Sequence, residues 1–451
     1  MNRSVQILIA LLFQAAAPGP ASAATSPTTP AAALSPRPGP PSLTADDVLT
    51  IHDGRLFLDH KPFAEISFNK FDLLWQLYDE LQAGRTLDPT NQLVQAQDHA
   101  LSTLHQLGFR SVRIFALPWG PAGPAAYADP SRRNLLYAAF DKTLDLCDAH
   151  DIRLAWSLAA GTFTDTKLDP VKGWVFGEEQ QRELISNPES RGRKLLYRYI
   201  SETVNRYKNR KAILLWEISN EVTLSADIGD QDRVYNGERM PSLKEVAGFF
   251  DDVARQIKAA DPLRLVTSGG SNMRESQWHL FLRQGWKTDT FEEQFNCFQL
   301  LYATSAVDVV DIHCYPNNHP GYAILGTNGQ SAWLDNQGYQ AIARRLAKPL
   351  IIGELGLQAM ARSEKKIWDE TPDYFESYDD TAAAKPWLQR TLNDVVEAGV
   401  PLTYWWCYQS DRAEDRTNRQ RFDLSLERNP ELLTSIVDAN RRLKQKLLGP
   451  K

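Results

Sequence analysis

The stretch "AILLWEISNEVTL", residues 212–224, holds an apolar run that leads directly into an amide and a carboxylate, Asn220 and Glu221. Residues 212–218 have the composition of a buried β-strand, and the polar pair stands where that strand should end. Because Asn is a common strand terminator, the pair could simply mark a turn. The rest of the chain decides between a turn and a functional site.

Similar apolar runs recur along the chain, and most are followed by a stretch of helical periodicity. The clearest helices are predicted at residues 134–150, 194–207, 243–260, 388–398 and 431–447. The candidate strands are residues 63–69, 111–117, 153–159, 212–220, 264–270, 307–315, 349–355 and 401–409. Strands that alternate with helices are typical of parallel βαβ units, and eight such units predict an α/β fold of the (β/α)8 TIM barrel type.

Loop lengths favour the barrel over a doubly wound open sheet. An open sheet would usually carry a Gly-rich turn after its first strand, and residues 67–75 contain no Gly. Helix-to-strand links are short, whereas the strand-to-helix links near residues 160–191, 222–242, 316–336 and 410–430 are long. The sequence therefore predicts one barrel with enlarged βα loops, on the face where barrels build their active sites.

The segment before the first strand has the pattern of a β-hairpin. Asp53 and Gly54 stand between alternating runs within residues 48–63, and Asp-Gly is a strong hairpin turn. We expect this N-terminal β-hairpin to lie across the N-terminal end of the barrel. Together with the barrel it defines one predicted catalytic domain, residues 46–451.

The N-terminal residues 1–23 have the pattern of a signal peptide. Arg3 precedes an apolar run at residues 5–13, and the small residues 21–23 fit a cleavage site. The run is shorter than the ~20 residues that span a bilayer, although an uncleaved anchor is the alternative. Residues 24–45 are rich in Pro, Ala, Ser and Thr and predict a linker. We expect a secreted or periplasmic protein with no membrane contact after cleavage.

Composition excludes several classes of function. The net charge of −6 argues against a nucleic-acid partner, since such proteins are usually basic. The four cysteines have no metal-site spacing, and we expect at most one disulfide. The eight histidines include no H-x-H pair, which argues against a metal-dependent barrel hydrolase. We predict no metal and no cofactor, and we expect a monomer.

Polar and aromatic residues gather in and just after the predicted strands, and Glu354 is the most unusual of them. A carboxylate inside a buried strand is costly unless it is paired, and Arg113 is a candidate partner. Glu221 and Glu354, on the fourth and seventh strands, would supply the two carboxyls that glycoside hydrolysis needs. The whole set is Asn69, Arg113, Trp119, Asn220, Glu221, His313, Tyr315, Glu354, Trp405 and Trp406.

Five short motifs, taken together and in this order, resemble glycoside hydrolase family 5 and its wider clan of retaining (β/α)8 glycosidases. The resemblance covers residues 48 to about 446. The motifs are "VRIF" at 112–115, "WEISNE" at 216–221, "DIHCYP" at 311–316, "IIGELG" at 351–356 and "YWW" at 404–406, before "CYQSD".

The resemblance implies a role for each strand-end residue. Glu221 matches the acid/base and Glu354 the nucleophile, while Asn220 would bind the 2-hydroxyl of the sugar. Arg113 and Tyr315 would orient Glu354 and keep it ionised, whereas a less charged environment would keep Glu221 protonated.

Three further residues follow from the same resemblance. His313 would lie near the acid/base. Trp406 would form the platform under the sugar at the cleavage point, because its distance to Asp411 fits the family pattern better than that of Trp405. Core packing is the alternative for either tryptophan.

The substrate is expected to be an oligo- or polysaccharide with β-linkages, of the β-mannan or β-glucan type. The third strand carries Trp156 and Ser157 where many cellulases have a His, which favours the mannanase-like branch, and Asn69 suits that branch as well. A transglycosylase would use the same residues, and a non-catalytic carbohydrate-binding barrel is a further alternative. Candidates for more distant sugar contacts, or simply for loop anchors, are Trp119, Trp174, Trp286, Trp333, Asp227, Asp230 and Asp232.

Overall fold

The computed structural model describes residues 43–117, 122–159, 179–227, 241–304, 306–315, 324–328, 331–334, 337–357, 377–409 and 423–449. The chain divides into two units, Met1–Gly39 and Pro40–Lys451, and every described residue belongs to the second. The predicted long loops at 160–191, 222–242, 316–336 and 410–430 lie largely outside the described residues, as do the predicted signal peptide and nearly all of the linker.

Eight parallel strands form the central sheet, in the order β8-β7-β6-β5-β4-β13-β12-β9. The first and last of these strands along the chain, β4 and β13, pair with each other, so the barrel is nearly closed, with one gap in the strand pairing between β8 and β9. This confirms the predicted (β/α)8 barrel. The strands are β4 (Glu65–Asn69), β5 (Ser111–Phe115), β6 (Arg153–Ala159), β7 (Ile213–Ser219), β8 (Val266–Thr267), β9 (Val310–Cys314), β12 (Leu350–Leu355) and β13 (Leu402–Trp405).

The strand predicted at 264–270 is much shorter than expected, because β8 contains only two residues. Gly269 has φ +66, a left-handed conformation that ends the extended backbone. Backbone and side-chain hydrogen bonds partly replace the missing ladder between β8 and β9. The backbone N–H of Asp308 donates to the Val266 carbonyl at 2.9 Å, and Thr267 Oγ1 donates to Asp311 Oδ2 at 2.9 Å.

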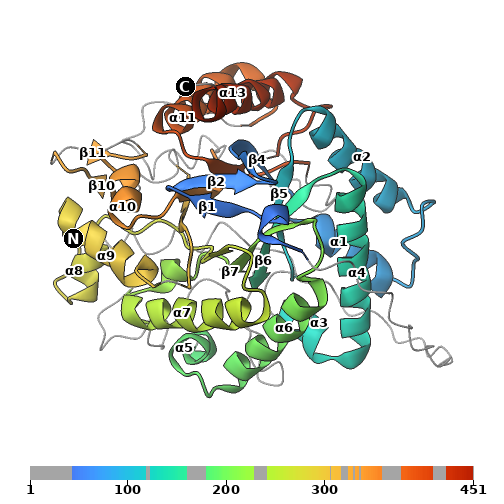
Figure 1. Cartoon of the computed structure of the whole chain (residues 1–451), viewed down its shortest axis with the longest axis horizontal. Coiled ribbons are helices and arrows are strands. Elements are labelled where there is room, and N and C mark those ends of the chain that lie inside the picture. Colours follow the sequence, from blue (N-terminus) through green and yellow to red (C-terminus); the bar gives the residue numbers. More distant parts are fainter. Residues whose placement is uncertain are drawn as a thin grey trace. The chain divides into compact units, whose positions relative to one another are not determined.

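Helices surround the strands in a ring (Figure 1). Polar N-caps begin many of them; the Ser242 hydroxyl, for example, accepts the N–H of Glu245 at the start of α7. All five predicted helices are present. The helices are α1 (Leu73–Gln82), α2 (Gln92–Gln106), α3 (Ala122–Ala128), α4 (Pro130–Ala149), α5 (Glu179–Ser186), α6 (Arg191–Tyr207), α7 (Leu243–Ala260), α8 (Gln277–Phe281), α9 (Phe291–Tyr302), α10 (Tyr339–Arg345), α11 (Thr381–Ala398) and α13 (Pro430–Leu448). None of these helices combines the length and the apolar character that crossing a membrane requires.

The N-terminal hairpin is confirmed and extends to a third strand. β1 (Thr50–His52), β2 (Arg55–Leu58) and β3 (Lys61–Pro62) form an antiparallel sheet, and the turn residues Asp53 and Gly54 both have positive φ. Leu49 and Leu56 are buried against the inward-facing residues near the N-terminal ends of the barrel strands. Arg153 at the start of β6 contacts both carboxylate oxygens of Asp59 at 3.0 Å.

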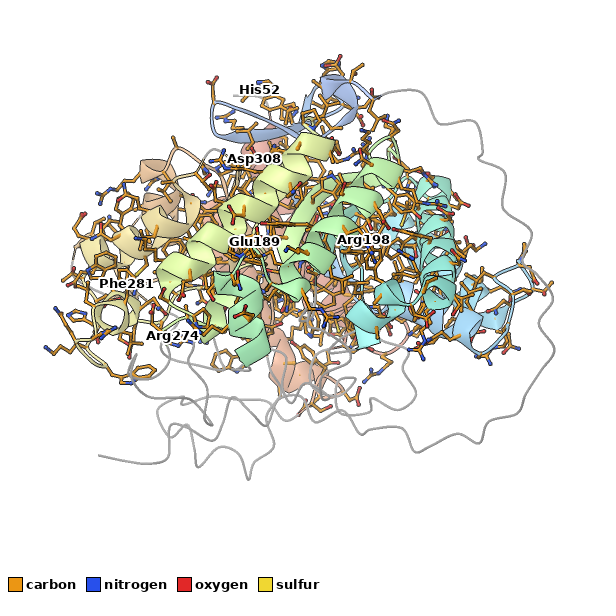
Figure 2. The ribbon with its side chains drawn as sticks, turned by 90° about the horizontal axis from the view of Figure 1, so that it is seen from below. His52, Glu189, Arg198, Arg274, Phe281 and Asp308 are labelled. Carbon is orange, nitrogen blue, oxygen red and sulfur yellow. The ribbon has the colours of Figure 1, made fainter. Side chains whose placement is uncertain are left out.

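The two ends of the barrel are therefore different. His52, in the N-terminal sheet, and Asp308, just before β9, lie toward one end of the molecule, and Arg274, after β8, lies toward the other (Figure 2). A smaller hairpin, β10 (Ile324–Leu325) and β11 (Ser331–Ala332), follows β9. All four cysteines are buried, and no disulfide joins any two of them, within the expected limit of one.

Candidate active site

Arg113, in β5, is the centre of a buried hydrogen-bond network. Its guanidinium donates to both oxygens of Glu217, at 2.7 and 2.6 Å. It also donates to Asn69 Oδ1 at 2.8 Å, to Glu354 Oε1 at 2.8 Å and to Asn220 Oδ1 at 2.7 Å. These bonds match the five N–H groups of an arginine. Arg113 thus positions four side chains from three other strands or their ends.

Glu354, in β12, accepts hydrogen bonds on both of its carboxyl oxygens. Arg113 bonds one of its oxygens, and the hydroxyl of Tyr315 donates to the other at 2.7 Å. His313 Nδ1 lies 3.7 Å from Oε1. Burial raises the pKa of Glu354, and the His313, Arg113 and Tyr315 side chains oppose that rise. Donors directed at both oxygens favour the ionised form, which is the form that can act as a nucleophile.

Glu221 follows β7 in a different environment. Its backbone is left-handed, with φ +56, and its N–H donates to the Gly269 carbonyl at 2.7 Å. This conformation brings its carboxyl close to His313, whose Nδ1 lies 3.3 Å from Oε1. Burial raises the pKa of Glu221 to about 7, with Arg113 opposing the rise and Glu217 adding to it. A carboxyl of this kind is partly protonated near neutral pH and can donate a proton.

The two glutamates stand at a short separation. One oxygen of Glu221, one oxygen of Glu354 and a ring nitrogen of His313 all lie within 4.8 Å of one another. Retaining glycosidases hold their two carboxyls ~5–5.5 Å apart, whereas inverting enzymes hold them ~6.5–9.5 Å apart and place a water between them. The 4.8 Å bound joins one oxygen of each carboxyl and lies below the inverting range.

Asn69 and Asn220 use their side chains differently. Asn69 donates from Nδ2 to the carbonyls of Gly353 and Tyr404, at 3.1 and 3.2 Å, and accepts from Arg113. Its amide therefore ties three neighbouring strands together, and its predicted role in substrate binding stays a prediction. Within the part of the chain that the structure describes, Nδ2 of Asn220 is buried and has no hydrogen-bond partner. This N–H group is available to a ligand, in keeping with the predicted sugar contact.

Trp406 lies just after β13 and is almost fully buried. Its ring stacks on Phe71, with centroids 4.7 Å apart and an interplanar angle of 12°. The peptide bond between Trp406 and Cys407 is cis. Trp405 and Trp406 both belong to the hydrophobic core, at 0% and 3% exposure, so the sugar platform at Trp406 stays a prediction.

The residues predicted as more distant sugar contacts or loop anchors lie in different settings. Trp119, Trp174, Asp230 and Asp232 lie outside the described residues. Trp286 is 64% exposed, whereas Trp333 packs against the hydrophobic core. Asp227 is buried and accepts the backbone N–H of Leu243 at the start of α7, so it anchors a loop.

Within the described part of the chain, three groups of side chains bring potential metal ligands together. In the group with Glu221 and Glu354, both oxygens of Glu354 already accept strong donors, so a cation would compete with Arg113. In the group around α8 and α9, Asp289 accepts hydrogen bonds from two backbone N–H groups and lies 2.6 Å from His279 Nδ1. These bonds give Asp289 a structural role as a loop anchor. The groups are Glu221–His313–Glu354, Glu217–Asp311–His313 and His279–Asp289–Glu293.

The sequence analysis missed two residues of the site, Glu217 and Asp311. Glu217 forms the bidentate pair with Arg113, and Asp311 lies within 4.8 Å of both Glu217 and His313, measured between potential ligand atoms. Both interrupt apolar strands, in "LLWEIS" and "VVDIHC". A charged residue in the middle of a predicted buried strand indicates a paired or functional side chain. This sign was present at Glu217 and Asp311 as well as at Glu354.

The chain folds as an eight-stranded α/β barrel with two carboxyls close together at its strand ends. Similar solved structures include a glycoside hydrolase family 5 mannosidase from Rhizomucor miehei, with 15% identity, a TM-score of 0.59, and coverage of 89% of this chain and 99% of that one. An endo-beta-1,4-mannanase from Thermotoga petrophila has 13% identity, a TM-score of 0.51, and coverage of 86% and 78%. An endo-1,4-beta-mannanase from Eisenia fetida has 15% identity, a TM-score of 0.51, and coverage of 88% and 95%. The chain therefore has the fold of these enzymes.

The similarity in sequence is more local. A probable mannan endo-1,4-beta-mannosidase C from Aspergillus terreus (strain NIH 2624 / FGSC A1156) is 33% identical over 90 residues. The match spans 19% of this chain and 21% of that protein, so the chain matches about a fifth of the length of this curated relative. No family model matches the chain.

Proposed function

We propose that the protein is a retaining glycoside hydrolase that cleaves a β-linked glycan of the mannan type. The observation that carries the proposal is the carboxyl pair: Glu221 and Glu354 present oxygens within 4.8 Å of one another. Their environments differ as the mechanism requires, since Glu354 accepts donors on both oxygens and the pKa of Glu221 is raised to about 7. The mannanases and mannosidases with this fold support β-mannan as the substrate class.

The reaction would proceed in two steps. Glu354 attacks the anomeric carbon while protonated Glu221 transfers its proton to the glycosidic oxygen, so the bond to the leaving sugar breaks and a glycosyl ester forms on Glu354. Ionised Glu221 then takes a proton from water as that water attacks the anomeric carbon, which releases the sugar and restores both glutamates. Asn220, with its available N–H, would hold the sugar 2-hydroxyl.

The remaining parts of the proposal concern export and the oligomeric state of the enzyme. The N-terminal pattern of Arg3, an apolar run and small residues supports export as a soluble protein. We infer that the mature enzyme acts as a monomer on an oligo- or polysaccharide. N-terminal sequencing of secreted protein should start near Ala24, and intact Met1 on a membrane fraction would contradict export.

A substrate panel tests the activity. Reducing ends released from β-mannan, cellulose, xylan and mixed-linkage glucan should be highest on β-mannan. Activity should disappear in Glu354→Ala and persist in Glu189→Ala, a control that removes an exposed glutamate of the surface (Figure 2). Release from none of the four glycans would refute the proposal, and release from another glycan alone would refute the substrate class.

Azide tests the two roles separately. Azide should rescue Glu221→Ala and give a glycosyl azide of retained configuration, because the covalent intermediate still forms. With Glu354→Ala, azide should attack from the face of the missing nucleophile and give the inverted product. The opposite pair of anomers would mean that the two roles are exchanged.

A further inference from the structure

The barrel is irregular at two places beside the proposed catalytic glutamates. In the first, the pairing of β12 with β9 passes from Ile352 directly to Glu354 and skips Gly353. In the second, β8 contains only two residues, and within the described strands no ladder joins it to β9. Backbone groups that are buried at such places need hydrogen-bond partners other than a neighbouring strand.

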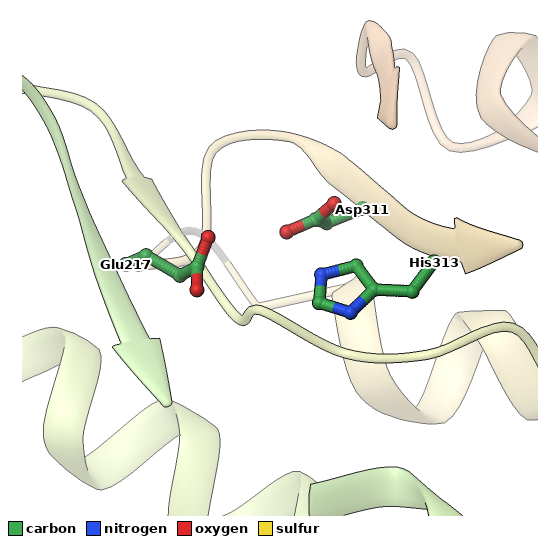
Figure 3. Close-up of side chains that lie close together, drawn as sticks. All are labelled: Glu217, Asp311 and His313. Carbon is green, nitrogen blue, oxygen red and sulfur yellow. The ribbon is translucent and has the colours of Figure 1, made fainter. Parts of the chain in front are cut away.

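The carboxyl of Asp311, in β9, bonds the backbone at both places. Its Oδ1 accepts the N–H of Gly353 at 3.0 Å, and its Oδ2 accepts the N–H of Gly269, just after β8, at 3.2 Å. Oδ2 also accepts the hydroxyl of Thr267, in β8, at 2.9 Å. Asp311 is fully buried, and Figure 3 shows its carboxyl in the space between β9 and β7. One side chain therefore spans the gap between β8 and β9 and bonds β12 as well.

The bond to Gly353 acts on Glu354, the next residue in β12. A residue that is skipped in strand pairing forms a bulge, and a bulge changes the direction of the side chain beside it. The carbonyl of Gly353 accepts Nδ2 of Asn69 at 3.1 Å, so side chains from two other strands bond both polar groups of this residue. The bulge that carries Glu354 is thus fixed from both sides.

The bond to Gly269 acts on Glu221 through the backbone. The carbonyl of Gly269 accepts the N–H of Glu221 at 2.7 Å. Glu221 has φ +56, and a residue with a side chain keeps this left-handed conformation only where its surroundings impose it. A Cβ on Gly269 would lie 1.8 Å from the Ser219 carbonyl, so this glycine fits closely against the end of β7. Asp311 therefore holds the N–H of the glycine whose carbonyl holds Glu221.

We infer that Asp311 is a positioning residue that sets the spacing of the two glutamates across the gap in the barrel. One of its oxygens holds the backbone before Glu354, and the other holds the backbone that supports Glu221. A displacement of about 1 Å between reacting groups can cost on the order of 100-fold in rate. The effect on catalysis rests on the proposed function, whereas the two backbone bonds do not.

Kinetics on two kinds of substrate test this role. Asp311→Asn keeps the shape of the side chain but has one acceptor oxygen, so it should lose one backbone bond and lower kcat about 10-fold. Asp311→Ala loses both bonds and should lower kcat about 100-fold, on activated aryl glycosides as well as on β-mannan, because the nucleophile is displaced along with the acid. KM should stay within about threefold, since Arg113 and not Asp311 holds the sugar-binding Asn220.

Asp289→Asn is the matched control for Asp311→Asn. Asp289 is also fully buried and accepts two backbone N–H groups, those of Trp278 and His279, but it lies in the loop between α8 and α9. The control should keep kcat within about twofold, even if its stability in urea falls as much as that of Asp311→Asn. Equal losses of kcat in the two variants, or a rise in KM with kcat unchanged, would overturn the inference. If Asp311→Ala does not fold, this pair of Asn variants decides.

Hydrogen exchange of the two glycine amides tests the contacts without any substrate. In protein labelled with nitrogen-15 glycine, the amide of Gly353 or of Gly269 should exchange about tenfold faster in Asp311→Asn than in wild type. Neither amide should change in Asp289→Asn, and unchanged exchange at both glycines in Asp311→Asn would overturn the inference. A wild type that cleaves none of the glycans would instead refute the proposed function and the catalytic role. Faster exchange would then still establish Asp311 as the group that holds these two backbone segments.

Discussion

Replacing Tyr315 by Phe removes one hydrogen bond from the proposed nucleophile and leaves the ring in place. The Tyr315 hydroxyl donates to Glu354 Oε2 at 2.7 Å, in a buried setting where it stabilises the ionised form. A hydrogen bond to a charged group contributes about 1.5–3 kcal/mol. Since one pKa unit corresponds to ~1.4 kcal/mol, the pKa of Glu354 should rise by roughly one to two units.

The pH profile of kcat/KM measures this change. Glu354 must be ionised to attack, so the acidic limb of the profile should move to higher pH by about the same one to two units. On the acidic side of the limb, activity should fall by roughly 10- to 100-fold, and the loss should be smaller at higher pH.

Tyr127→Phe is the matched control for this experiment. The Tyr127 hydroxyl also donates to a carboxylate at 2.7 Å, that of Glu202, but on α3 and α6 at the outside of the barrel. The control should leave the acidic limb unchanged. If Tyr315→Phe leaves the limb in place, or moves it to lower pH, then Tyr315 does not hold Glu354 ionised and the assignment of Glu354 as the ionised partner fails.

Other predictions concern Glu221, the proposed acid, and Gly353, which directly precedes Glu354 in β12. The kcat/KM of wild type should fall as pH rises through about 7, because Glu221 must be protonated to act; a flat profile between pH 6 and 8, values about one unit either side of that pKa, would contradict this. At about pH 8 the free energy of unfolding of Glu221→Gln, measured in urea, should exceed that of wild type by up to about 3 kcal/mol. This gain should vanish below about pH 4.5. The sign follows because a raised pKa costs stability only where the unfolded carboxyl is ionised. Gly353→Ala should lose about 1–3 kcal/mol of stability, because its Cβ would lie 2.6 Å from His313 Nε2. Gly248→Ala, which meets nothing within 4 Å, should lose none.

The pattern of the sequence was sufficient for the architecture. Alternating apolar runs and helical stretches depend on local periodicity, and all eight strands occur where the sequence placed them. The fifth was predicted at 264–270 and spans only Val266–Thr267, because the side chain of Asp311 replaces part of its pairing. The extra strand β3 was missed because two residues carry almost no periodic signal.

For the site, the sequence by itself determined which residues lie at the strand ends, including Glu221, His313 and Glu354, because parallel strands end on one face of a barrel. Only the tertiary structure decided which of them bond each other. Arg113 and Glu217 are 104 residues apart in the chain and 2.6 Å apart in the fold. The balance of buried charge depends on such pairs, which strand periodicity does not encode. That balance, set across the barrel, gives chemically similar carboxyls different environments, since Glu354 accepts donors on both oxygens and the pKa of Glu221 is raised to about 7.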